Sequence, residues 1–464
     1  MRVLLAVCAL VVPIAAAGQD HLVAAGVLEG RPAPADTSPL QRLADQAAPG
    51  ATVRVPAGRY AGDLVIDKPL RLVGTGRPVL VGSGKGSVIR IRANDVTVEG
   101  FDIDGRRGGD LGRDSSGLHV AALRATIRDC RIADALFGVY LREAHGSAVE
   151  RCRIKGIPGR DPGEKGSGIH AYNTLDFHLV DNELVDVRDG LYLQNSSRGV
   201  IRGNRVRDMR YGVHYMFSDD NTFEGNTFEN GAAGAAIMYS QRILFSRNRF
   251  LHNRGFASVG LLLQQCDDVR ADENFIGDNA RGVFLEGTHR STFTRNVIAQ
   301  SDVAIVMFAS AERTVFHGNL FAGNMSPLQF VGRRTDADFD GNYWSDSREP
   351  DLDGDGYADR PYRLSSVFDH FRGNLTAADL FVDGFAASAV AAAEQAFPII
   401  QAATVSDRRP LAKAPLLAGV PPPPLAERTA NAAGLSVSGA AAAMGLAGLS
   451  RGRRPRRLAR ESAS

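Results

Sequence analysis

Short stretches of alternating apolar and polar residues recur along most of the chain, and a glycine opens each of them. The glycine is followed by an apolar residue, a variable residue and a second apolar residue, an alternation typical of a half-buried β-strand. These glycines are Gly117, Gly138, Gly168, Gly190, Gly212, Gly260 and Gly282. The pattern predicts a strand at each position, with both apolar side chains in a core and the variable side chain facing outward.

A second marker follows these stretches: an asparagine or cysteine placed two residues before an apolar residue. It falls at Cys130, Cys152, Asn182, Asn204, Asn226, Asn248, Asn274, Asn296, Asn319 and Asn342. The successive spacings are 22, 30, 22, 22, 22, 26, 22, 23 and 23 residues. A repeat of about 22 residues therefore organises this part of the chain, with insertions at 157–164 and near 254–258.

A repeat of this length with two short β patterns fits either leucine-rich repeats or a parallel β-helix. Leucine-rich repeats need leucine at fixed places and a helical half, whereas these segments hold Val, Ile and Phe without a helical stripe. The sequence therefore predicts an all-β fold, a right-handed parallel β-helix over residues 51–345 with coils about 4.8 Å apart. We expect the recurrent asparagines to lie at turns, each bonding to its counterpart in the next coil.

Other segments flank the predicted β-helix. Ser38 and Pro39 begin a short helix within 36–50 that would cap the open end of the first coil. Downstream we expect an irregular extension over 346–407 with an Ala-rich helix at about 376–396, and then a Pro-rich linker over 408–431. The last segment, 432–464, is an Ala/Gly-rich run followed by an arginine cluster. It fits a disordered tail or a membrane anchor.

The N-terminus has the features of an export signal. Arg2 precedes an apolar run from Val3 to Ala17 that ends in small residues, and the run is too short to span a membrane. Removal of residues 1–17 would take Cys8 away and leave three cysteines, at positions 130, 152 and 266, in an oxidising compartment. Cys130 and Cys152 occupy one ladder position in consecutive coils, about 5 Å apart, so they could form a disulfide or act as small fillers.

Charge excludes nucleic acid as the main partner. The 464 residues carry 54 Lys and Arg against 52 Asp and Glu, a net charge of +2. The first 17 residues hold one arginine and no acid, and the last 14 hold six arginines and one glutamate. The remaining body therefore has 54−1−6 = 47 basic and 52−1 = 51 acidic residues, and this net of −4 lacks the broad basic face that nucleic acid requires.

Stacking of the coils predicts two outward-facing columns with unusual chemistry. The variable residues form one column: His119, Tyr140, His170, Tyr192, His214, Ala236, Leu262 and Phe284. The residues two positions further on form the other: Ala121, Arg142, Tyr172, Gln194, Met216, Met238, Gln264 and Glu286. An exposed stripe of this kind indicates a binding surface, for which we select His119, Tyr140, Tyr172, Tyr192 and Phe284. The alternative is that the C-terminal segment covers the same face.

Imidazole and thioether groups in this stripe suit copper, especially Cu(I). We therefore select His170, His214, Met216 and Met238 as candidate copper ligands. A second candidate metal site is Asp351-Leu-Asp353-Gly-Asp355-Gly, with Asp359, which matches the first nine positions of a calcium loop. Tyr362 replaces the bidentate glutamate expected at position 12, so this loop is incomplete and calcium would have a structural role.

Enzymatic function is the main alternative, because parallel β-helices often act on acidic polysaccharides. A lyase, epimerase or hydrolase needs clustered carboxylates or basic groups in a groove. The stripe is short of carboxylates, with Glu286 alone at one end, and no nucleophile triad, Walker loop or Cys-x-x-Cys is apparent. We therefore predict no catalytic residues and no enzymatic activity, and keep a carbohydrate-active lyase or epimerase as the alternative.

Several strings resemble one family. Gly212-Val-His-Tyr-Met-Phe-Ser-Asp-Asp-Asn221, Ala236-Ile-Met-Tyr-Ser240 and Gly260-Leu-Leu-Leu-Gln-Gln-Cys266 are similar to the nitrous oxide reductase maturation family NosD. The same holds for Asn342-Tyr-Trp-Ser-Asp346, Asp351-Leu-Asp-Gly-Asp-Gly356 and Ser366-Val-Phe-Asp-His-Phe371. The resemblance runs from about residue 36 to 415, so it does not include the arginine-rich tail.

The resemblance implies a periplasmic, non-enzymatic factor that helps to assemble the copper–sulfide centre of nitrous oxide reductase. It implies an ABC-type ATPase and its membrane permease as partners, and a periplasmic copper chaperone is a further candidate. The family's copper-binding character agrees with the His/Met stripe but supplies no ligand set for individual residues. We expect the protein to hold copper, or to dock the apo-reductase, on this face.

Overall fold

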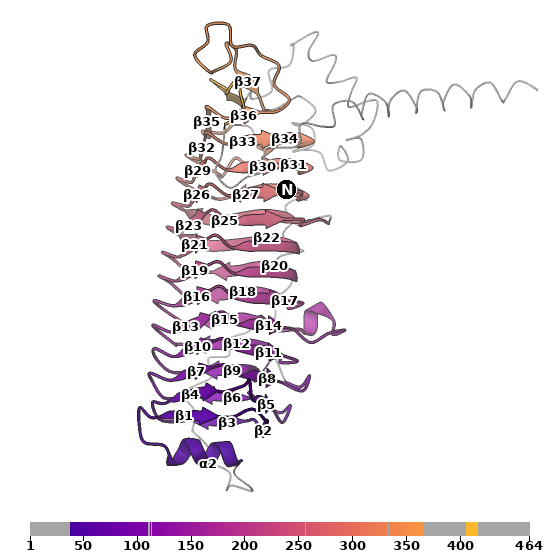
Figure 1. Ribbon diagram of the computed structural model, residues 1–464. Helices are drawn as coiled ribbons and strands as arrows, with labels where there is room; N and C mark the ends of the chain where they lie inside the picture. The colour runs from indigo at the N-terminus through magenta and orange to yellow at the C-terminus, as the bar shows by residue number, and fades with distance from the viewer. Residues whose placement is uncertain are drawn as a thin grey trace, which may run out of the picture. The chain divides into compact units, whose positions relative to one another are not determined.

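The computed structural model describes residues 38–364, apart from 110, 111, 113, 256 and 333, and residues 405–415. The predicted export signal, the helix expected at 376–396 and the segment 432–464 lie outside these residues. The described part of the chain forms a right-handed parallel β-helix of about 13 turns, which confirms the predicted fold class. Figure 1 shows the coils stacked one on another from β1 to β36.

Each coil contributes strands to three faces, and equivalent strands pair in parallel from coil to coil. The first face consists of β1 (Thr52–Val55), β4 (Arg71–Gly74), β7 (Thr97–Glu99), β10 (Thr126–Arg128), β13 (Ala148–Glu150), β16 (His178–Val180), β19 (Val200–Arg202), β21 (Thr222–Glu224), β23 (Leu244–Ser246), β26 (Arg270–Asp272), β29 (Thr292–Thr294), β32 (Val315–His317) and β35 (Asp338–Asp340). The second consists of β2 (Arg59–Ala61), β5 (Val79–Val81), β8 (Asp102–Asp104), β11 (Arg131–Ala133), β14 (Arg153–Lys155), β17 (Glu183–Val185), β24 (Arg249–Leu251), β27 (Phe275–Gly277), β30 (Val297–Ala299), β33 (Leu320–Ala322) and β36 (Tyr343–Trp344).

The third face carries both columns predicted from the sequence. Its strands are β3 (Leu64–Ile66), β6 (Ile89–Ile91), β9 (Ser116–Val120), β12 (Phe137–Arg142), β15 (Ile169–Tyr172), β18 (Asp189–Gln194), β25 (Val259–Asp267), β28 (Arg281–Glu286), β31 (Val303–Phe308) and β34 (Ser326–Val331). Two long strands, β20 (Arg205–Met216) and β22 (Thr227–Gln241), run without a break through the second and third faces. In each of these two middle coils, one continuous strand therefore spans the second and third faces.

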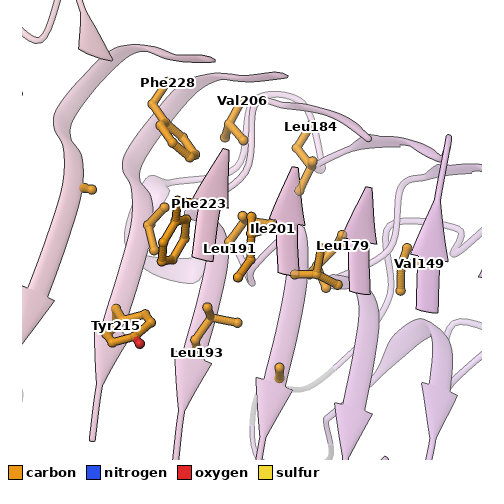
Figure 2. Close-up of a cluster of buried hydrophobic side chains, with 14 of the residues drawn as sticks. Val149, Leu179, Leu184, Leu191, Leu193, Ile201, Val206, Tyr215, Phe223 and Phe228 are labelled. Atoms are coloured by element: carbon orange, nitrogen blue, oxygen red, sulfur yellow. The ribbon is translucent and has the colours of Figure 1, made fainter. Parts of the chain in front are cut away.

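The interior is filled by the apolar residues of the repeat and by an asparagine ladder. Leu191, Leu193 and Tyr215 point inward from the third face and pack with Phe223 and Phe228, as Figure 2 shows. The side-chain amide of each asparagine from Asn182 to Asn319 donates to the carbonyl oxygen of the asparagine side chain in the next coil, at 2.8–3.0 Å. These bonds confirm the predicted ladder and satisfy buried polar groups that would otherwise destabilise the core.

Both ends of the β-helix are covered. Helix α2 (Pro39–Gln46) begins at Ser38, whose hydroxyl accepts a hydrogen bond from the Gln41 amide, as the sequence predicted. At the other end, β38 (Ser406–Asp407) pairs with β35 and with β37 (Tyr362–Arg363). The buried Asp407 carboxylate accepts from the Asn342 amide and from the Trp344 indole, so it terminates the asparagine ladder.

The last coil also holds the start of the segment that we expected to be a linker. Leu411 bridges to Tyr343 and Tyr357, and its amide donates to the Asn342 carbonyl. Residues 408–415 therefore pack on the end of the β-helix, and a linker can begin only beyond them. The physical reason is that the last coil exposes unpaired backbone groups, which this segment satisfies.

Candidate functional site

The two outward columns of the third face have the register that the sequence predicted. The first column pairs coil by coil, from His119 with Tyr140 to Leu262 with Phe284. In the second column, Arg142 pairs with Tyr172 and Met216 pairs with Met238. Each outward side chain is therefore stacked on its counterparts in the adjacent coils.

The first half of this column is an aromatic column of alternating imidazole and phenol rings: His119, Tyr140, His170, Tyr192 and His214. Consecutive ring centroids lie 5.3, 4.4, 4.3 and 4.8 Å apart. The first four rings are stacked face to face, and His214 meets Tyr192 edge-on. The coil spacing produces this contact, because 4.8 Å between strands is close to an offset-stacked ring separation.

The column is less exposed than we expected. Tyr140 is 7% exposed, because neighbouring rings cover both of its faces and Phe137 contacts it edge-on. Further along, Phe284 is buried in a cluster with Ala236, Leu262 and Met238, although all of these positions face away from the core. Of the predicted binding surface, Tyr140 and Phe284 are thus buried, and His119, Tyr172 and Tyr192 are half-buried.

Burial also sets the protonation of two histidines in the column. Desolvation, reinforced by nearby arginines, lowers the pKa of His119 to about 4, and desolvation lowers the pKa of His170 to about 3. Both imidazoles are therefore neutral near pH 7. Within the described part of the chain, the buried Nδ1 atom of His170 has no hydrogen-bond partner.

A polar triad of Asp189, Arg210 and His214 lies at the end of the aromatic column. Arg210 donates from Nε and Nη2 to the two carboxylate oxygens of Asp189, at 2.9 and 2.7 Å. His214 Nδ1 lies 3.2 Å from Asp189 Oδ2. Burial raises the pKa of the Asp189 carboxyl, but the hydrogen bonds and charges of His214 and Arg210 outweigh burial, and its net pKa lies below the ordinary value.

This contact fixes the orientation of the His214 ring. Arg210 Nη2 also lies 3.3 Å from His214 Nδ1, but its shorter bond, at 2.7 Å, is to Asp189 Oδ2, and the ionised Asp189 can only accept a hydrogen from His214. We therefore assign a hydrogen to Nδ1, which donates it to Asp189. The lone pair of Nε2 is then available to bind a metal ion. A carboxylate behind a histidine is the usual support of a metal-ligating imidazole, because it fixes the tautomer and raises the basicity of the ring.

A methionine pair lies next to this histidine. Met216 is two residues from His214 on the same strand, β20, and faces the same side, and Met238 is paired with Met216 across adjacent coils. His170 is not part of this group, since it lies two coils from His214 with Tyr192 between the two rings. Three of the four candidate copper ligands thus occupy adjacent outward positions of the third face, and copper binding by them stays a prediction. Imidazole and thioether are donors that Cu(I) prefers.

The calcium-like loop is built as a compact turn of carboxylates. Ligand atoms of Asp351, Asp353 and Asp355 lie within 4.8 Å of one another, and within the described residues they are the only such group of three. Asp359 accepts a hydrogen bond from the Leu352 amide at 2.7 Å, which closes the loop. Tyr362 at position 12 donates its hydroxyl to Asp346 at 2.8 Å. Calcium binding by this loop stays a prediction.

The structure distinguishes the two roles that the sequence left open for Cys130 and Cys152, a disulfide or small fillers of the core. Cys130, Cys152 and Cys266 are free and buried. Cys130 Sγ donates to the Arg128 carbonyl and Cys152 Sγ to the Glu150 carbonyl, at 3.3 and 3.4 Å, so the disulfide is absent. These two thiols act as small fillers that continue the asparagine ladder, since the Cys152 amide donates to the Asn182 side chain.

Sequence reasoning missed Asp189 and Arg210. Both precede the glycines of their strands, Gly190 and Gly212, by one and two residues, outside the columns that the alternation defines. The available signal concerns Asp189, a carboxylate at a position where the following coils have Tyr211, Ala233 and Val259.

Comparisons with known proteins agree with this architecture. The sequence model described as "Right handed beta helix region" matches residues 81–228. The A-module of the mannuronan C-5 epimerase AlgE6 of Azotobacter vinelandii superposes with a TM-score of 0.55 at 14% identity, over 62% of this chain and 89% of that one. An N-terminal fragment of the bacteriophage Phi29 gene product 12 superposes with a TM-score of 0.51 at 12% identity, over 62% and 61%. At these identities the likeness concerns the fold alone.

In the described residues, none of the helices is long and apolar enough to cross a membrane. The sequence model described as "Periplasmic copper-binding protein (NosD)" matches residues 156–352, which include the polar triad and the methionine pair. Two relatives, each named "Probable ABC transporter binding protein NosD", come from Stutzerimonas stutzeri and Pseudomonas aeruginosa. They are 31% and 33% identical over 85% of this chain and over 93% and 94% of their own lengths. Extending over nearly the whole of both relatives, this similarity shows that the chain belongs to the NosD family.

Proposed function

We propose that this protein is a periplasmic maturation factor that holds copper on its third face for the assembly of the copper–sulfide centre of nitrous oxide reductase. Copper is the cargo in this role, and the protein catalyses no reaction of its own. An ABC-type ATPase and its permease would be its membrane partners, which the names of the two relatives support. Export to the periplasm, through the signal predicted at residues 1–17, follows the description of the family.

One observation carries the proposal: two thioethers in register beside an imidazole whose other nitrogen is held by a buried carboxylate. Met216 and Met238 would bind copper through sulfur, and His214 would bind it through Nε2. Soft donors of this kind select Cu(I) over the harder divalent ions. Three neutral ligands on a rigid sheet fit a protein that passes its metal on. They bind the ion but leave one coordination position open, unlike a closed tetrahedral site.

The test is a Cu(I) titration of residues 18–464 against a colorimetric chelator of known affinity. His214→Ala and Met238→Leu should each lower the affinity about tenfold or more, because each removes one donor. Met307→Leu is the matched control. Met307 is a buried methionine of the same face that points into the core, and its loss should leave copper affinity unchanged. Unchanged affinity in both ligand variants would contradict the assignment of the copper residues.

The same preparation tests the enzymatic alternative. Incubation with mannuronan and with pectin, followed by mass spectrometry and NMR of the polymer, should show neither cleavage nor epimerisation. Turnover of either polymer would contradict the proposed function as a whole. This control is informative because the fold itself is shared with an epimerase module.

A further inference from the structure

Two aromatic side chains project from the turn that follows the methionine pair. Phe217 and Tyr239, the aromatic pair, are 53% and 48% exposed, and their rings stack at 5.2 Å. They directly follow Met216 and Met238 in the sequence. Large apolar side chains exposed together on a soluble protein usually mark an interaction site.

The backbone under the aromatic pair is unfavourable for such residues. Both have left-handed conformations, with φ of +51° and +52°. The equivalent turn positions hold Asn195 in the preceding coil and Gln265 and then Gly287 in the following two; Asn and Gly accept this conformation readily, whereas Gln265 shares the strain. A bulky residue there costs about 1 kcal/mol or more, so stability does not account for the aromatic pair.

The turn is also held rigidly from inside. The hydroxyl of the buried Tyr215 donates to the Ser218 carbonyl and accepts from the Asn221 amide. The Ser218 amide in turn donates a hydrogen bond to the hydroxyl oxygen of Ser240 in the next coil, at 3.0 Å. The aromatic pair is therefore preorganised, and a partner would lose little entropy in ordering it.

Beside the rings lies an open hollow of about 580 Å³. It is lined by Phe217, Asp219, Tyr239, Ser240, Gln241, Gln265, Asp267, Gly287 and His289. These residues come from four consecutive coils, so the hollow extends about 14 Å along the axis, the length of roughly four residues of extended peptide.

The polar groups of the hollow define the chemistry of its occupant. Two carboxylates line it: Asp219, which accepts from the Gln241 backbone and side-chain amides at 3.0 and 3.2 Å, and Asp267, which lies 2.9 Å from His289 Nδ1. Arg242 and Arg290 contact these carboxylates at 3.5 and 3.2 Å but do not line the hollow. The apolar rings favour a large apolar side chain, and the carboxylates favour a neighbouring basic one.

We propose that the hollow is the docking site for an extended segment of the client reductase, which receives copper from the methionine pair. The segment places a large apolar side chain against Phe217 and Tyr239 and a Lys or Arg side chain near Asp219 and Asp267. This inference rests on the proposed function, since it names the surface through which that function reaches a client. Docking here places the partner against the two residues that directly follow Met216 and Met238 in the sequence.

The test measures binding of apo nitrous oxide reductase to the immobilised protein, with the double variant Phe217→Asn/Tyr239→Asn. These substitutions install the residue type found at position 195. We expect at least about 30-fold weaker binding, the effect of removing a hot-spot pair, together with an unchanged or higher melting temperature. A structural role for the rings would instead lower the melting temperature. Raising the salt concentration should also weaken wild-type binding, because a charged contact contributes to it.

Controls separate this inference from the copper assignment. Met216→Leu/Met238→Leu should abolish copper binding but leave docking intact, and the double asparagine variant should keep its copper affinity. If the reductase binds both forms equally, or does not bind the wild-type protein, the docking proposal is overturned while the copper site can still hold. Competition for the hollow by mannuronate oligosaccharides would also overturn it, in favour of a sugar site.

Discussion

Replacing Asp189 by asparagine tests whether a buried carboxylate positions the copper-binding histidine. The substitution keeps the size and shape of the side chain but removes its charge and one of its two acceptor oxygens. In the wild-type protein, Asp189 accepts two hydrogen bonds from Arg210 and one from His214 Nδ1. The asparagine cannot serve all three donors, so His214 loses its fixed orientation and tautomer.

Two magnitudes follow from this geometry. Loss of a carboxylate behind a metal-ligating histidine typically costs 10- to 100-fold in metal affinity, or about 1.4–2.8 kcal/mol. Stability should also fall, because breaking a buried ion pair from one side costs about 3–5 kcal/mol. Arg210 keeps 24% of its side chain exposed, which allows water to replace part of the lost partner, so we expect a loss near 3 kcal/mol.

A second variant separates the two effects. Asp189→Leu/Arg210→Met removes both the uncompensated guanidinium and every acceptor at position 189, so it should recover most of the stability, measured by urea unfolding, while His214 still lacks its anchor. Copper affinity should therefore stay low in both variants. If affinity returns with stability, or never falls by more than threefold, Asp189 supports the fold alone and the argument from ring orientation is wrong.

Two further predictions concern the core and the aromatic column. Asn226→Ala leaves the Asn204 amide and the Ile201 carbonyl without their partners in the dry interior, so it should lower the free energy of unfolding in urea by about 3 kcal/mol. Asn226→Cys restores a donor, as Cys152 does in its own coil, and should lower this free energy by less. The pKa of His170 is about 3 in the folded protein and ordinary in the unfolded chain, so its contribution to the free energy of unfolding is complete above pH 6.5 and is lost as the pH falls toward 3. Between pH 7 and pH 4 the wild-type free energy of unfolding should therefore fall by up to about 3 kcal/mol more than that of His170→Phe, which keeps the stacking. Equal decreases in the two proteins would show that the His170 ring titrates normally.

The register of the third face could be predicted because it depends on two local signals, a 22-residue period and a glycine before each strand. Together these placed Met216 opposite Met238 and Tyr192 opposite His214 without any knowledge of the fold. A one-residue error in register would have turned every such side chain inward, so the alternation constrains the result strongly.

The features that the sequence did not reveal depend on non-local contacts. Asp407 terminates the asparagine ladder from 65 residues away, and no pattern links Ser406-Asp407 to Asn342. Asp189 meets His214 across 25 residues, because their strands β18 and β20 are paired in adjacent coils. The reduced exposure of Tyr140 follows from ring stacking. The alternation of apolar and polar residues shows that this side chain faces outward, but it does not show which neighbouring side chains cover it.

The placement of the methionine pair on β20 and β22 bears on how a flexible side chain can form a metal site. Methionine has three rotatable bonds, so ordering two of them for one ion costs conformational entropy. Here Met238 is 4% exposed, and Met216 packs against the same cluster, so much of this cost is met during folding rather than during copper binding. The two longest strands of the β-helix fix the spacing between the two backbones at the same point. The rigidity of the solenoid is therefore part of the site: it supplies preorganisation that a loop carrying the same residues would lack.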